Sequence, residues 1–221
     1  IVVEADESDA SFLFLQPVLA VVTNIDSDHM ATYDHNFANL ENAFYELLQR
    51  LPFYGVAVLC GDDPVVRRLT TKINKPYVTY GFNEGCDFQA INVKEMGIGM
   101  VFQVRYKSDT GQSNYLEVRL SLPGRHNVQN ALAAIAVCLE VGASEKAIEK
   151  ALHEFKGVNR RFEVHRNLKI KSNDYVTLID DYGHHPKEIE ATLQATRGAF
   201  PNRRLLLVFQ PHRYSRTRDC F

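Results

Sequence analysis

Two spacings of apolar residues alternate from the start of the chain to about Tyr80, and they predict helices placed between strands. Apolar side chains recur every three or four positions from Phe37 to Leu51, which predicts a helix that Pro52 ends. The continuous apolar run from Val56 to Cys60 predicts a buried parallel strand, and Tyr77 to Tyr80 predicts a further short one. We therefore expect repeated strand–helix–strand units, the pattern of an α/β fold.

The pattern changes between Asp87 and Leu122, where apolar and polar residues alternate and glycines interrupt them. Such alternation predicts an antiparallel meander. Helical spacing then returns up to Gly142, and a second helix is predicted from about Ser144 to Phe155. The polar, glycine-bearing segment that follows predicts a domain boundary, with domains at residues 1–156 and 157–221.

Composition narrows the class of protein. The 221 residues are 45% hydrophobic and 24% charged, enough for a sizeable core in one large or two small domains. The net charge of -2 argues against a general nucleic-acid binder. The four cysteines follow no metal or disulfide spacing, and neither a membrane-spanning run nor a signal peptide is evident, so we expect reduced thiols in a cytoplasmic protein without a membrane partner. Because the chain opens on Ile1 in a predicted strand, we also expect it to be part of a longer protein.

Acidic and imidazole side chains follow three predicted strands at the point where each ends. The strands and the groups behind them are Ile1–Val3 with Glu4, Val18–Val22 with Asp28 and His29, and the buried-type strand Tyr175–Ile179 with the run Asp180 to Pro186. Ligands of open α/β sheets bind outside the carboxyl ends of the strands, so we expect one site at this edge. A single carboxylate there is more often a solvated loop residue or a helix cap, but three such strand ends favour a site.

Two further segments carry candidate chemistry. A helix is predicted from Pro186 to about Ala199 and an apolar strand from Leu205 to Phe209, after which Arg213, Arg216 and Arg218 offer guanidinium groups that could bind phosphate or carboxylate. A solvated basic loop is the alternative.

Asn127 and Asn130 lie three positions apart at a predicted helix start, so both amides can project on one side of the first turn. An asparagine side chain donates and accepts in parallel, and this pair of groups matches the N6 and N7 edge of adenine. Asn127 alone could equally cap the helix, but the second asparagine, inside the helix, weakens that reading.

These motifs follow the order found in a known family. They are Glu4–Phe12, Thr23–Met30, Pro123–Asn130, Asn159–Phe162, Asp180–Pro186 and Gln210–Asp219. Together they span nearly the whole chain and resemble the Mur ligases, most closely the branch that joins L-alanine to UDP-N-acetylmuramate. The resemblance implies a central ATPase domain, mainly a parallel sheet with an antiparallel meander, followed by part of a Rossmann-like C-terminal domain. It also implies that the glycine-rich phosphate loop lies upstream, so we expect these 221 residues alone to be inactive.

The resemblance implies a reaction as well. ATP phosphorylates the muramoyl carboxylate, and the amine of L-alanine attacks the resulting acyl phosphate. Glu4 and His29 would bind Mg²⁺, although imidazole is an unusual ligand for this hard cation. The other implied roles are: His126, Asn127 and Asn130 around adenine; Arg161 at the ATP phosphates; Asp180 or Asp181 near the ribose; and Tyr182, His184, Arg213 and Arg216 at the acceptor and the amino acid. The sequence does not distinguish His184 from His185, of which one would be catalytic and the other packed or capping.

The chain departs from the family pattern near His29. Ala31 stands where the family usually carries aspartate, with Asp34 as a possible substitute. No lysine occurs from His29 to Arg50, although many Mur ligases use a carbamylated lysine there, which weakly favours the alanine-adding branch. Two alternatives stay open: the branch that attaches a recycled tripeptide to the same UDP-sugar, and a non-catalytic nucleotide-binding module. The chain could act as a monomer or a homodimer.

Overall fold

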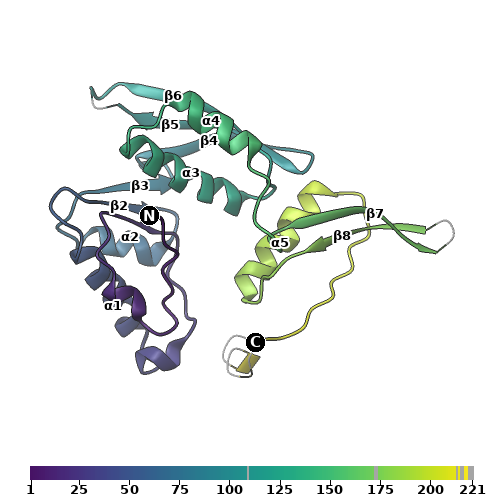
Figure 1. Cartoon of the computed structure of the whole chain (residues 1–221), viewed down its shortest axis with the longest axis horizontal. Helices are drawn as coiled ribbons and strands as arrows, with labels where there is room; N and C mark the ends of the chain where they lie inside the picture. Colours follow the sequence, from purple (N-terminus) through teal and green to yellow (C-terminus); the bar gives the residue numbers. More distant parts are fainter. Residues whose placement is uncertain (109, 172–173, 213, 215–216, 219–221) are drawn as a thin grey trace. The chain divides into compact units, whose positions relative to one another are not determined.

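The computed structural model describes residues 1–108, 110–171, 174–212, 214 and 217–218. Contacts divide the chain into two compact units, one formed by residues 1–91, 103–116 and 129–145, the other by residues 92–102, 117–128 and 146–221. The described residues form a six-stranded sheet in the order β1-β2-β3-β4-β5-β6 and a two-stranded sheet, β7-β8 (Figure 1).

The strands of the large sheet are β1 (Leu19–Val22), β2 (Val56–Cys60), β3 (Tyr77–Gly81), β4 (Phe88–Met96), β5 (Gly99–Lys107) and β6 (Ser113–Leu120). Its helices are α1 (Phe37–Gln49), α2 (Pro64–Thr70), α3 (Arg125–Glu140) and α4 (Glu145–Glu154), with short 3-10 turns η1 (Ser11–Phe14) and η2 (Met30–Tyr33). The remaining elements are β7 (Glu163–Lys171), β8 (Asp174–Asp180) and α5 (Pro186–Ala199).

The predicted strand–helix–strand units are confirmed. Strands β1, β2, β3 and β4 pair in parallel, with Val21 opposite Val58 and Val58 opposite Val78. Asn36 caps α1 by accepting the backbone N–H of Ala38, and Asp63 caps α2 in front of a proline at the first helical position. These caps explain where each helix begins.

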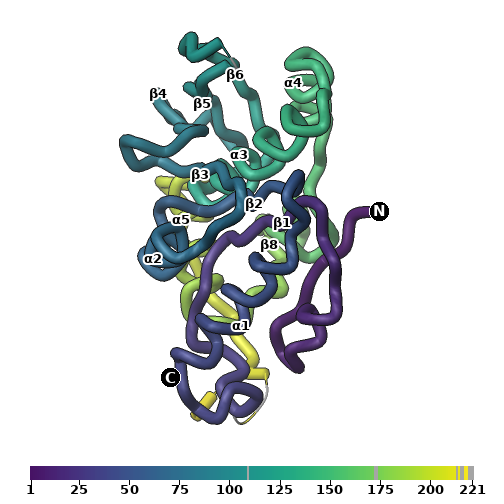
Figure 2. Tube along the Cα trace, turned by 90° about the vertical axis from the view of Figure 1, so that its left-hand side faces the viewer, coloured from purple at the N-terminus to yellow at the C-terminus, as the bar shows by residue number. Residues whose placement is uncertain are grey.

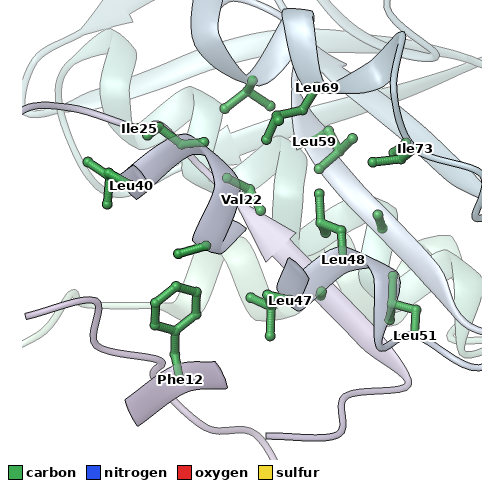
Figure 3. Close-up of a cluster of buried hydrophobic side chains, with 14 of the residues drawn as sticks. Phe12, Val22, Ile25, Leu40, Leu47, Leu48, Leu51, Leu59, Leu69 and Ile73 are labelled. Carbon is green, nitrogen blue, oxygen red and sulfur yellow. The ribbon is translucent and has the colours of Figure 1, made fainter. Parts of the chain in front are cut away.

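One apolar cluster forms the core beside β1 and β2 (Figure 3). Helix α1 contributes Leu40, Leu47 and Leu48, all at most 6% exposed, and α2 contributes Val66 and Leu69. They pack with side chains of β1 and β2, so both helices cover the same face of these strands. Each buried leucine stabilises the fold by roughly 1.5–3 kcal/mol, which anchors the strand ends that follow.

The predicted meander is confirmed in β4, β5 and β6, which are neighbours in chain order (Figure 2). Short connections at residues 97–98 and 108–112 join them, so successive strands reverse direction. Along β6 the buried and exposed positions alternate, as expected for a sheet with one covered face. Helix α3 ends where Gly142 adopts φ +80°, which confirms the predicted stop.

Three sequence-based expectations about strands are wrong. Ile1–Val3 and Leu205–Phe209 form no strand in the structure, and their apolar side chains are largely exposed. Strand β8 exists, but its Leu178 is 50% exposed because, among the described strands, β8 pairs with β7 alone, in antiparallel register. A strand is buried when neighbours and helices cover it, and these conditions lie outside the local sequence.

The expected single sheet edge is therefore not formed either. Glu4 follows no strand, and β8 belongs to a different sheet from β1. Within the described part of the chain, no helix is both long enough and apolar enough to cross a lipid bilayer.

Candidate functional site

The loop after β8 is built around the carboxylate of Asp181. One of its oxygens accepts the backbone N–H of Gly183 at 2.7 Å and the other accepts that of Phe162 at 2.9 Å. A Cβ on Gly183 would lie 2.7 Å from the same carboxylate, so only glycine allows this close approach. Asp181 thus holds the loop to the segment that precedes β7.

Arg160 adds a second connection between the same two segments. Its carbonyl oxygen accepts the N–H of Tyr182 at 2.7 Å, and its guanidinium lies 4.9 Å from the centre of the Tyr182 ring. Its Nε also lies 3.5 Å from Asp180, whose side chain is 41% exposed. The two adjacent aspartates therefore differ, since Asp181 is committed to backbone groups and Asp180 remains open to solvent.

Glu188, in the first turn of α5, is the third connection. Its Oε2 accepts the backbone N–H groups of His184 and His185 at 2.9 and 3.1 Å, and its Oε1 accepts from Arg161 Nη1 at 3.2 Å. Burial raises the pKa of Glu188, but the two backbone N–H groups, His184 and Arg161 outweigh it and leave the pKa below its usual value of 4.5. The carboxylate is therefore held in its charged form.

The structure separates the two adjacent histidines. His185 is the N-cap of α5, where its Nδ1 accepts the N–H of Lys187 and Glu188 completes a capping box. His184 Nδ1 lies 3.0 Å from the carbonyl oxygen of Tyr182, and its ring meets the Tyr182 ring edge-on. Because a carbonyl only accepts, Nδ1 of His184 must donate, which leaves Nε2 free to accept a proton from a ligand.

The two asparagines predicted to bind adenine lie in the first turns of α3 and have different surroundings. The Asn127 side-chain amide donates to the carbonyl oxygen of Pro123 at 2.7 Å, which ties the helix start to the preceding turn, whereas Asn130 is exposed. Burial lowers the pKa of His126, which favours neutral imidazole. Gly124 adopts φ +91°, and a Cβ there would lie 2.8 Å from the His126 ring, so this turn requires glycine.

The carboxylate of Asp62, just after β2, binds the next part of α3 at Gln129. Asp62 accepts the backbone N–H groups of Phe82 and Asn83 and, at 2.7 Å, the side-chain amide of Gln129. Gln129 directly precedes Asn130, so this bond restrains α3 next to the exposed asparagine. The sequence offered no motif for the Asp62–Gln129 pair, because the two residues are distant along the chain.

The predicted metal ligands lie in the first unit. His29 has φ +53°, and its Nε2 is 3.5 Å from the Asp28 carboxylate. Glu4 is exposed. Among the described residues, no group of three or more His, Cys, Asp or Glu forms a metal-ligand set. Mg²⁺ commonly takes one or two carboxylates and completes its shell with phosphate and water, so Glu4 fits such a site as a single ligand.

Other predicted residues fall outside this description or were missed. Arg213 and Arg216 lie outside the described residues, while His212 is described, with its ring 6.2 Å from that of His184. Glu188 was missed by sequence reasoning. In a capping box, a glutamate stands three residues after the N-cap. Because Pro186 predicts the helix start and so makes His185 the N-cap, this pattern could have identified Glu188.

Comparison with known proteins identifies the relatives of this arrangement. Residues 2–138 match the Mur ligase middle domain, and residues 160–221 match the Mur ligase, glutamate ligase domain. A UDP-N-acetylmuramate–L-alanine ligase from Polaromonas sp. strain JS666 is 56% identical over all 221 residues, which are 47% of its length. The chain thus spans about half the length of the curated relatives that it matches.

Solved structures give the same answer for the fold. A UDP-N-acetylmuramate-alanine ligase from Thermotoga maritima superimposes with a TM-score of 0.77 at 29% identity, covering 95% of this chain and 45% of the other. A murein peptide ligase from Psychrobacter arcticus gives 0.61 at 25% identity, covering 87% and 37%. The match of the middle-domain model to more than half of the sequence shows that this chain belongs to the Mur ligase family.

Proposed function

We propose that the protein containing these residues joins L-alanine to UDP-N-acetylmuramate and converts ATP to ADP and phosphate in the process. The observation that carries this proposal is the whole-chain identity of 56% to a ligase named for that reaction. The higher similarity to the alanine-adding structure than to the murein peptide ligase favours L-alanine over a tripeptide.

The proposed reaction has two chemical steps. A carboxylate oxygen of the muramoyl group attacks the γ-phosphorus, and the bond from phosphorus to the bridging oxygen breaks to release ADP. The amine of L-alanine then attacks the acyl carbon, loses a proton, and expels phosphate with the electron pair of the C–O bond. Both steps bring anions together, so positive groups and hydrogen-bond donors are needed more than a protein nucleophile.

Residues of this chain supply such groups. Arg161 donates to Glu188 through Nη1, and its remaining guanidinium donors would bind ATP phosphates. Asn130 offers an exposed amide for adenine, with His126 and Asn127 shaping the turn beside it. Asp180 and Asp181 would bind or frame the ribose. Mg²⁺, held by Glu4 and His29, would neutralise phosphate charge when bound.

The acceptor side of the site centres on His184. Its Nε2 is available to take the proton that the attacking amine loses, and Tyr182 packs against the ring. Arg213 and Arg216 would bind the acceptor anion. We place the boundary between the two functional domains at residues 156 and 157 and the reaction in the cytoplasm, where ATP and UDP-sugars are found.

The proposal is tested with a full-length ligase that carries these residues. We expect ADP and phosphate release to require both UDP-N-acetylmuramate and L-alanine. ATP binding without any amide product would instead favour a non-catalytic nucleotide-binding module.

A further inference from the structure

Glu188 occupies a position that capping alone does not explain. Its two oxygens are divided between two tasks, since Oε2 accepts the N–H groups of His184 and His185 and Oε1 accepts from Arg161. The carboxylate therefore connects the residue proposed at the ATP phosphates with the loop proposed at the incoming amino acid.

The surrounding contacts make this connection stiff. Asp181 binds the N–H groups of Phe162 and Gly183, and the Arg160 carbonyl binds the N–H of Tyr182. Phe162 is 6% exposed, which fixes the residue next to Arg161. The backbone beside Arg161 and the backbone of the loop after β8 are thereby held, and Glu188 restrains the Arg161 side chain itself.

From this geometry we propose that Glu188 is a positioning residue for Arg161, which it holds ready for the nucleotide phosphates while it caps α5. The inference rests on the proposed function. An arginine already restrained by one bond loses less conformational entropy when phosphate binds, and its other donors remain available. Loss of this restraint weakens phosphate binding without disturbing the helix.

The test uses an asymmetry between glutamate and glutamine. Glutamine at this helical position still completes a capping box. Glutamine has only one acceptor oxygen, however, so in Glu188→Gln the oxygen that stays on the two backbone N–H groups turns the NH₂ group toward Arg161. A donor then faces a donor, and the arginine loses its restraint while the cap persists.

The experiment measures turnover, ATP affinity and thermal midpoint of the full-length ligase. We expect Glu188→Gln to raise KM for ATP about three- to fivefold, as expected for a partly exposed ion pair, with little change in kcat and a thermal midpoint lowered by less than in Glu188→Ala. Glu190→Gln is the matched control, because Glu190 is exposed on the same helix, where its carboxylate accepts from the side-chain amide of Gln194. It should leave all three quantities unchanged.

A double-mutant cycle with Arg161→Ala completes the test. We expect Glu188→Gln to have no further effect on KM for ATP once Arg161 is removed. An unchanged KM in the single variant, additive effects in the cycle, or a thermal midpoint as low as that of Glu188→Ala would each overturn the inference and leave Glu188 as a cap only. Failure of the proposed function is a separate result, since it would appear in the wild-type enzyme as absence of amide product, whether or not ATP binds.

Discussion

The backbone N–H of Tyr182 donates to the carbonyl oxygen of Arg160 at 2.7 Å, and this bond joins the loop after β8 to the segment before β7. Arg160 reaches this geometry with φ +57°, a conformation that non-glycine residues rarely adopt. Backbone strain of this kind persists where the surroundings over-determine it, and it is common at functional sites. The relationship explains how the proposed phosphate-binding arginine next in sequence keeps a fixed position relative to the histidine loop.

The two adjacent histidines should respond differently to replacement by alanine. His184→Ala removes the proposed proton acceptor, so turnover should fall by about 10²–10⁴ with little loss of stability. His185→Ala removes the cap of α5 and should cost about 1 kcal/mol of stability while turnover per folded molecule stays nearly normal. Thermal midpoint and turnover measured on the same preparations check both outcomes. The assignment would be reversed if His185→Ala abolished turnover in fully folded protein.

Replacement of Asn130 and of Asn127 by alanine should also have different effects. Asn130→Ala should raise KM for ATP, by roughly 1–3 kcal/mol of lost binding, because the exposed amide is the one left for adenine. Asn127→Ala removes a bond to the Pro123 carbonyl oxygen, so its main effect should be a lower thermal midpoint. KM for UDP-N-acetylmuramate serves as the control. Equal changes in both KM values for Asn130→Ala would indicate helix destabilisation rather than a lost adenine contact.

His29 is best tested with glycine, because glycine tolerates the positive φ that His29 adopts and offers no side-chain ligand. If the imidazole binds metal beside the acceptor, His29→Gly should fold normally and lose turnover by orders of magnitude across a Mg²⁺ series. His35→Gly is the matched control, since His35 is exposed and also has a positive φ of 54°. A depressed midpoint with near-normal turnover per folded molecule would remove His29 from the catalytic residues.

Acidification should destabilise the α5 region through Glu188. Because its pKa in the folded protein lies below the usual 4.5, the folded state favours the carboxylate, and that contribution is present above pH 4.5. It is lost as the pH falls through the folded pKa. The thermal midpoint of Glu188→Gln should therefore fall less steeply below pH 4.5 than that of the wild type. Parallel curves for the two proteins would show that this carboxylate does not contribute to acid sensitivity.

The sequence predicted the parts of the fold that depend on local pattern. Helices α1 and α5 lie where apolar spacing and proline placed them, and β2 and the meander follow the expected alternation. Pairing between distant segments was not predictable. The antiparallel partner of β8 and the exposure of Leu178 depend on which strands surround them.

The candidate site, too, was predictable from the sequence only in part. His184, Arg161 and Asn130 carried motif signals, whereas the bonds of Asp181 and Glu188 are made to backbone N–H groups. One of these groups belongs to Phe162, which has the unusual φ of +53°. Ordinary residues in the left-handed region leave no mark in the sequence. The choice between His184 and His185 likewise required the position of the helix start.

The most direct measurement is the identity of the amide formed by a full-length ligase that carries these residues. The enzyme would be supplied with ATP, Mg²⁺ and UDP-N-acetylmuramate, and with either L-alanine or the tripeptide, and products would be followed by mass spectrometry. We expect UDP-N-acetylmuramoyl-L-alanine, with one ADP and one phosphate released per amide, and little product from the tripeptide. Preferential use of the tripeptide, or ATP binding without formation of either amide, would contradict the proposed function.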